Sequence, residues 1–275
     1  MGRLMCCIAV CVTAILLQSS VEASELSSKG LVAKKAAIIE LMHSKARKAL
    51  VTAAQDARYH NYFVSQSDHE RAKLKGDIDT ISLEVQSHFH VEEMCLIDPT
   101  GTEISRIVGN SIAYDLDTGE SDNVFFAPGF QLKARTVYIS PIYISGDADK
   151  WVVAYVTPII VEGETKAILH YEHDLATYQN AVNKDLVSND RFIVAVHPDG
   201  WVIADSRRPI EVAKKGKSEN PEDYFERFSW GGMSAGELKT RLGESLSSVI
   251  EVDGQAYDVA YAMAEQWTLF VVSRR

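Results

Sequence analysis

The chain carries little positive charge for its size. Its 275 residues include 28 Lys and Arg against 38 Asp and Glu, which gives a formal net charge of −10. No stretch is rich in lysine or arginine. A protein that binds the phosphate backbone of nucleic acid needs a basic face. The composition therefore predicts no nucleic-acid partner.

The sequence also lacks the common signatures of phosphate, dinucleotide and metal chemistry. It has no phosphate-binding loop, no dinucleotide fingerprint, no C-x-x-C pair and no H-E-x-x-H motif. We therefore predict no cofactor, no bound metal and no enzymatic activity. Two weaker patterns remain. His170, Glu172 and Asp174 alternate along one predicted strand and could hold a cation. Gly232–Gly236 fits G-x-S-x-G around Ser234, but a polar segment precedes it where a nucleophile elbow needs a buried strand.

Long apolar runs are scarce, and the only extended one is at the N-terminus. Arg3 precedes the apolar run Leu4–Leu17, and Val21-Glu22-Ala23 follows it. This order is typical of a secretory signal peptide, and the run is shorter than the ~20 residues that span a bilayer. We predict a signal peptide over residues 1–23, cleavage after Ala23, and a periplasmic or secreted protein; an uncleaved N-terminal anchor is the alternative.

Cysteine is nearly absent from the predicted mature chain. Three of the four cysteines lie in the signal peptide, so only Cys95 remains and no internal disulfide can form. Cys95 lies in the apolar run Met94–Ile97. We predict that it is a small buried hydrophobic residue.

The rest of the chain predicts a long helix and two similar α+β halves. Apolar residues at helical spacing predict one helix over residues 29–64. Two hairpins follow, with turns at Asp98–Gly101 and His197–Gly200, and their prolines lie 99 residues apart. Each hairpin precedes a polar, partly helical stretch and three more strands, which indicates loose internal duplication. The predicted strands are Val137–Ile144, Trp151–Ile160 and Lys166–Glu172 in the first half, and Ser247–Val252, Ala256–Met263 and Trp267–Ser273 in the second.

This organisation resembles the double Cache family of PAS-like (PDC) extracellular sensor domains, which occur in bacterial chemoreceptors and histidine kinases. The segments that carry the resemblance are Leu96–Arg106, Val137–Tyr143, Trp151–Ile159 and Leu169–Leu175. The resemblance implies an α+β fold with a long N-terminal helix and two modules, each a five-stranded antiparallel sheet with flanking helices. The implied boundaries are residues 65–180 for a ligand-binding module of the membrane-distal type and residues 181–275 for a membrane-proximal one.

The resemblance also implies a small-molecule site in the first module. Its last three strands would line the pocket, and Glu172 matches the acid that pairs with the ligand amine in amino-acid-binding members. Phe125–Phe130 stands where those members carry the motif that grips the α-carboxylate, so an ordinary amino acid is not the expected ligand. The predicted ligand-binding residues are Arg106, Tyr138, Ser140, Tyr143, Trp151, Tyr155, His170, Glu172 and Asp174.

Family members usually continue into a transmembrane helix and a signalling domain, whereas this sequence ends after a short strand-like run. We therefore expect a free-standing, exported module that binds a small metabolite and acts through a membrane receptor or kinase. A homodimer through the N-terminal helix is a further expectation. Two alternatives stay open: a structural subunit that uses the Leu31–Ala57 helix only for dimerisation, and a secreted serine hydrolase that uses Ser234.

Overall fold

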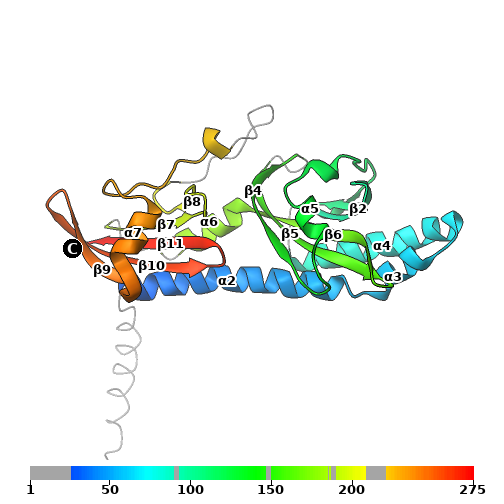
Figure 1. Ribbon diagram of the computed structural model, residues 1–275, viewed down its shortest axis with the longest axis horizontal. Helices are drawn as coiled ribbons and strands as arrows, with labels where there is room; N and C mark the ends of the chain where they lie inside the picture. The colour runs from blue at the N-terminus through cyan, green and yellow to red at the C-terminus, as the bar shows by residue number, and fades with distance from the viewer. Residues whose placement is uncertain (1–25, 90–92, 147–149, 185, 187–189, 209–220) are drawn as a thin grey trace, which may run out of the picture.

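The structure is a computed structural model, which describes residues 26–275 apart from 90–92, 147–149, 185, 187–189 and 209–220. The predicted signal peptide and its cleavage site lie outside the described residues. The described part is α+β, with a long N-terminal helix followed by two antiparallel sheets and flanking helices, as predicted (Figure 1). None of its helices is both long enough and apolar enough to span a membrane.

Three helices precede the first strand: α2 (Ser28–Ala53), α3 (Ala57–Val64) and α4 (Asp68–Phe89). The prediction of one helix over residues 29–64 was wrong, because the helix ends at Ala53 and a new one begins at Ala57. Asp56 is extended and accepts the Arg58 N–H at 2.9 Å, so it caps α3. The change of direction brings Tyr59 into the core, where it is fully buried.

Helix α2 runs along both sheets and joins the two modules into one core (Figure 1). Its buried apolar stripe packs against residues of both modules and comprises Leu31, Val32, Ala36, Ile39, Ala46, Leu50 and Ala53. Leu41 lies outside this stripe and is 54% exposed. The chain itself covers this apolar stripe. The stripe is therefore not available as a dimer interface.

The first module contains a six-stranded sheet in the order β3-β2-β1-β6-β5-β4. The additional strand is β3, a short strand at the edge of the sheet. The prediction of five strands did not include it. The strands are β1 (Glu93–Ile97), β2 (Glu103–Val108), β3 (Ser111–Ala113), β4 (Tyr138–Ser145), β5 (Lys150–Val161) and β6 (Glu164–Asp174). Helix α6 (Leu175–Asn183) then leads into the second module.

The second module contains a five-stranded sheet in the order β8-β7-β11-β10-β9. The strands are β7 (Arg191–Val196), β8 (Val202–Asp205), β9 (Ser247–Val252), β10 (Gln255–Ala264) and β11 (Trp267–Arg274). Helix α7 (Ala235–Leu242) and the short helices η2 (Pro221–Asp223) and η3 (Gly243–Ser245) lie in the connection between β8 and β9. Ser234 caps α7 in a capping box with Glu237, as its spacing predicted.

The two sheets repeat each other in register as well as in strand order. Both predicted hairpins are present, and Gly101 and Gly200 adopt φ values of +85° and +91°, which favour glycine. Cys95 pairs with Arg106 and with His170 on either side, and the residue 99 positions later, Val194, pairs with Asp205 and Phe270. Both hairpins carry a bulge next to the turn. The duplication therefore extends to individual positions.

The connection between β3 and β4 covers one face of the first sheet. It contains η1 (Glu120–Asp122) and the short helix α5 (Phe126–Phe130). A Cβ atom on Gly129 would come within 2.7 Å of Val156 Cγ1, so glycine is what lets α5 approach the sheet this closely. This cover encloses the side chains beneath it.

Candidate functional site

The first sheet has two different faces. One face, beneath α5, holds Cys95, Ala154, Val156 and His170 and is called the α5 face here. The other holds Tyr155 and Tyr171, which are paired in register, and packs toward α2; it is called the α2 face. Since side chains alternate along a strand, neighbouring residues of β5 or β6 contribute to opposite faces.

A buried polar cluster occupies the α5 face. His170 and Glu172 project from β6, and each is 2% exposed. The Tyr143 hydroxyl, from β4, donates to Glu172 Oε1 at 2.5 Å and lies 3.0 Å from His170 Nε2. Phe125 stacks on the His170 ring with 3.9 Å between centroids. The result is a chain of imidazole, phenol and carboxylate, closed off by an aromatic ring.

The same face carries further acids on β1 and β2. Glu93 lies opposite Glu172 in register, as Cys95 lies opposite His170. Cys95 Sγ is 3.3 Å from Glu93 Oε1 and 3.0 Å from Glu103 Oε1. The other Glu103 oxygen accepts the Asp117 N–H at 2.7 Å. Cys95 is buried in an apolar cluster, as predicted, but its sulfur also contacts two carboxylates, which the prediction did not include.

Arg106 is the positively charged residue next to these acids. It is 4% exposed, its Nη1 lies 3.5 Å from Glu103 Oε2, and its Nη2 lies 2.8 Å from Asp115 Oδ1. A backbone hydrogen bond, and then the hydrogen bond and charge of this guanidinium, hold the pKa of the exposed Asp115 below its usual value. Arg106 is therefore engaged with carboxylates of the protein itself.

Burial governs protonation on the α5 face. Removal from water lowers the pKa of His170 to about 3, so the imidazole is neutral at ordinary pH. Burial, and then the nearby Glu93 and Glu103, raise the pKa of the Cys95 thiol well above its usual value. Burial and the charge of Glu172 likewise raise the pKa of Tyr143. The thiol and the phenol are therefore protonated.

A second buried network occupies the α2 face. The Tyr155 hydroxyl lies 2.5 Å from His43 Nδ1 of α2 and is hydrogen-bonded to the Tyr178 hydroxyl of α6. Tyr178 is in turn 3.3 Å from His173 Nδ1, and His43 packs edge-on to Trp267 of the second module. Burial lowers the pKa of both His43 and His173 to about 4. This network joins the first sheet, helix α2 and the second module.

Several solved structures with a similar architecture are sensor domains. The sensory domain of the Campylobacter jejuni chemoreceptor Tlp3 with isoleucine bound aligns over 97% of both chains, with a TM-score of 0.66 and 12% identity. The extracellular domain of vpHK1S-Z8, assigned as a histidine kinase, aligns over 89% of this chain and 88% of its own, with a TM-score of 0.63 and 13% identity. The ligand-binding domain of Mlp24 with asparagine aligns over 89% and 92%, with a TM-score of 0.54 and 14% identity.

These neighbours are sensor domains of the double Cache type. The chain has the double Cache fold. Searches against protein-family models and against curated proteins found no match. The likeness to these structures is therefore one of fold. The sequence identities are too low to match individual residues of the site between the proteins.

The double Cache fold brings some of the predicted ligand-binding residues together and separates others. Tyr143, His170 and Glu172 are in contact on the α5 face, where Arg106 also lies, joined through Glu103 and Cys95. Tyr138 packs at the edge of the apolar cluster on the same face. Trp151 and Tyr155 belong to the α2 face, and Trp151 packs 4.7 Å from Phe225 of the second module, measured between ring centroids.

Two other predicted residues have local structural partners. The Ser140 hydroxyl accepts the Ala154 N–H at 2.9 Å beside an irregularity in β4. Asp174 caps α6 by accepting the Ala176 N–H at 2.8 Å, and it lies 3.6 Å from Lys150. These contacts hold β4 and α6 in place at the rim of the α5 face.

The sequence analysis missed Glu93, Glu103 and Glu120 as members of this site. Each is buried, although glutamate is rarely buried without a partner. The signal was present in Glu93, because an acid that alternates with Cys95 in a strand-like run must share its face. Only the pairing of β1 with β6 shows that this face is also the face of His170 and Glu172.

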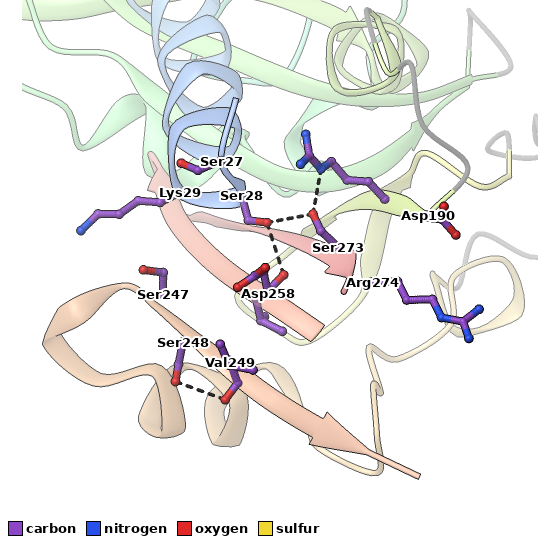
Figure 2. A pocket seen from close by; sticks show the side chains of 12 residues that line it. Ser27, Ser28, Lys29, Asp190, Ser247, Ser248, Val249, Asp258, Ser273 and Arg274 are labelled. Atoms are coloured by element: carbon purple, nitrogen blue, oxygen red, sulfur yellow. Dashed lines mark hydrogen bonds between the residues drawn. The ribbon is translucent and has the colours of Figure 1, made fainter. Parts of the chain in front are cut away.

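A separate cavity of about 680 Å³ lies in the second module, where α2 begins and β11 ends (Figure 2). Ser28 Oγ lies 2.8 Å from Ser273 Oγ, which also accepts a 2.7 Å hydrogen bond from Arg191 Nε. None of the predicted ligand-binding residues lines it. Serines and charged side chains, among them Lys29, Arg191 and Asp258, line this cavity, and it lies in the other module from the buried cluster of the α5 face.

Proposed function

We propose that the protein is an exported, non-enzymatic sensor module that binds a small amine on the α5 face of its first module. The observation that carries this proposal is the environment of Glu172, which is 2% exposed and shares its face with Glu93 and Glu103, while Glu120 of the covering connection lies near Tyr143 and Cys95. The Tyr143 hydroxyl already donates to Glu172 and fixes the orientation of its carboxylate on this face. A protonated amine would form a charge-assisted hydrogen bond with Glu172.

Free α-amino acids fit this face less well than simple amines do. Structural neighbours are described with isoleucine and asparagine bound, and an α-carboxylate needs a cationic partner. Arg106 already lies against Glu103 and Asp115. Phe125 covers the face with an aromatic ring, which suits the apolar part of a ligand. We therefore favour a monoamine or polyamine without an α-carboxylate.

A change at the α5 face would reach helix α2 through β6. Tyr171 and His173 flank Glu172 in the chain and project to the α2 face, where the network of Tyr155, Tyr178 and His43 begins. In this proposal Tyr155 transmits a change in packing and does not contact the ligand. The helix would then report that change to a membrane-bound receptor or kinase.

Thermal-shift measurements with matched variants test the ligand proposal. A ligand that binds only the folded protein stabilises it by about 2.7 kcal/mol at 100 times its Kd. We expect stabilisation by amines, and its loss in Glu172→Gln and Tyr143→Phe. Glu164→Gln, an exposed residue of β6 paired with Lys166, is the control and keeps the response. Stabilisation by amino acids alone, or an amine response that survives in Glu172→Gln, would contradict the proposal.

Export is tested by N-terminal sequencing of the protein from the periplasm or medium. We expect the mature chain to begin at Ser24, because cleavage follows Ala23. A chain that keeps residues 1–23 and sediments with membranes would support the uncleaved anchor instead.

A further inference from the structure

Three metal-ligand groups, two carboxylates and a thiol, meet on the α5 face beside the proposed amine site. One Glu93 oxygen, the Cys95 sulfur and one Glu103 oxygen all lie within 4.8 Å of one another. The three side chains are 4%, 1% and 2% exposed. They come from β1 and from the paired strand β2, so the sheet itself fixes their separation.

His170 adds an independent observation. It lies opposite Cys95 on β6, is 2% exposed, and its Nδ1 has no hydrogen-bond partner among the residues that the structure describes. Tyr143 donates its single proton to Glu172 and can therefore only accept from His170 Nε2. That assignment places the ring proton on Nε2 and leaves a lone pair on Nδ1. A neutral imidazole whose tautomer is fixed through its other nitrogen is what a metal ligand requires.

We propose that Glu93, Cys95, Glu103 and His170 bind one divalent transition-metal ion of the zinc class. Sulfur, nitrogen and carboxylate donors are the ligands that zinc prefers, whereas calcium takes oxygen ligands. Zinc–sulfur and zinc–oxygen bonds of about 2.3 and 2.0 Å at a tetrahedral angle separate the two ligand atoms by about 3.5 Å. The two sulfur–oxygen distances here are 3.3 and 3.0 Å, so the thiol and the two carboxylates need only small side-chain shifts. His170 is not in the group whose ligand atoms all lie within 4.8 Å of one another, so its ring must turn toward them when the ion binds.

The surrounding residues supply the outer shell that such a site needs. Glu103 accepts the Asp117 N–H and lies near Arg106, and Glu93 accepts from Ser145 at 3.4 Å. On binding, the thiol releases its proton to solvent and the sulfur becomes a thiolate ligand. Two carboxylates and a thiolate carry three negative charges, which a divalent ion and the Arg106 guanidinium balance.

This inference goes beyond the sensor proposal, because it assigns an ion to the floor of the face and stands whether or not an amine binds. The test uses protein exported from a host that expresses the full chain, stripped with a chelator and titrated with Co²⁺. We expect one equivalent to produce a sulfur-to-cobalt charge-transfer band in the near ultraviolet and the visible bands of a tetrahedral ion, both displaced by Zn²⁺.

Variants identify the ligands. Cys95→Ser should abolish the charge-transfer band, and Glu103→Gln and His170→Phe should each weaken Co²⁺ binding by about tenfold or more. Glu164→Gln should leave it unchanged. If circular dichroism shows that Cys95→Ser does not fold, the Co²⁺ affinities of Glu103→Gln and His170→Phe decide whether the site exists. Unchanged affinity in both variants then overturns it. No band at one equivalent, or a band that persists without Cys95, overturns the metal site. The amine screen needs no cobalt signal, so failure of either proposal is separable from failure of the other.

Discussion

The two modules share strand order, hairpin turns and register, yet they fill one equivalent face in opposite ways. In the first module the four central positions are Glu93, Cys95, His170 and Glu172. The positions that pair in the same register in the second module are Phe192, Val194, Phe270 and Val272. Phe270 stacks on Phe228 there, with 4.9 Å between centroids.

The difference shows that the polar residues are not a requirement of the fold. The same contrast continues on the neighbouring strand, where Glu103 of the first module corresponds to Val202 of the second. Burying carboxylates is unfavourable unless they are compensated, and apolar side chains of similar volume often stabilise such a position. The contrast supports the proposal that the polar face of the first module serves binding, whereas the apolar packing of the equivalent face in the second module serves stability.

The largest expected effect comes from breaking the apolar face. Phe270→Ala should lower the free energy of unfolding by about 3–5 kcal/mol, because it removes a fully buried ring and leaves a cavity. The equivalent change in the other direction, His170→Phe, should alter stability by less than about 1.5 kcal/mol or increase it. Urea unfolding measures both. Equal destabilisation by the two variants would show that both faces serve stability.

The next largest expected effect is a loss of stability on acidification, which arises from His170 on the polar face of the first module. The pKa of His170 is lowered by burial to about 3, so between pH 6.5 and 5 the unfolded chain takes up a proton there and the folded chain does not. Stability is therefore present above pH 6.5 and lost as the pH falls, by about 2 kcal/mol over that interval for this imidazole. Urea unfolding at pH 7, 6 and 5 should show a shallower loss in His170→Phe. Parallel curves for the two proteins would be inconsistent with a neutral, buried His170.

The α2 face of the first module should respond more moderately. Tyr155→Phe removes the hydroxyl that joins His43 and Tyr178, which leaves His43 Nδ1 without that partner. We expect a loss of about 1–3 kcal/mol in the free energy of unfolding and unchanged amine affinity, measured by calorimetry. A large loss of affinity would place Tyr155 in the ligand site after all.

The smallest effect should come from the helix that covers the apolar face of the second module. Ser234→Ala removes the capping box of α7 and should cost about 1 kcal/mol. Ligand and metal binding should not change, because Ser234 lies in the other module. An ester-hydrolysis assay on the same variant is the control for the hydrolase alternative; activity that disappears with Ser234 would revive it.

The residues alone determine the order of elements. Alternating apolar positions, two glycine-containing turns and matching three-strand tails predict an α+β chain with a long helix and two similar modules, because these signals are local. The break between helices α2 and α3 at residues 54–56 could not be recognised in the sequence, since neither glycine nor proline marks it. Asp56 caps α3, but aspartate is also common on the exposed surface of uninterrupted helices. The short strand β3 needs β2 as its partner and has little signal of its own.

The composition of the α5 face was decided by tertiary structure. Strand alternation shows that His170 and Glu172 share a face, and that Trp151 and Tyr155 share one, but it does not say that these are opposite faces. That answer depends on the register between β5 and β6, where Tyr155 pairs with Tyr171. The pairing of β1 with β6 likewise brings Cys95 to His170 from 75 residues away. Register follows from how the whole sheet packs against α2 and α5, so no local pattern contains it.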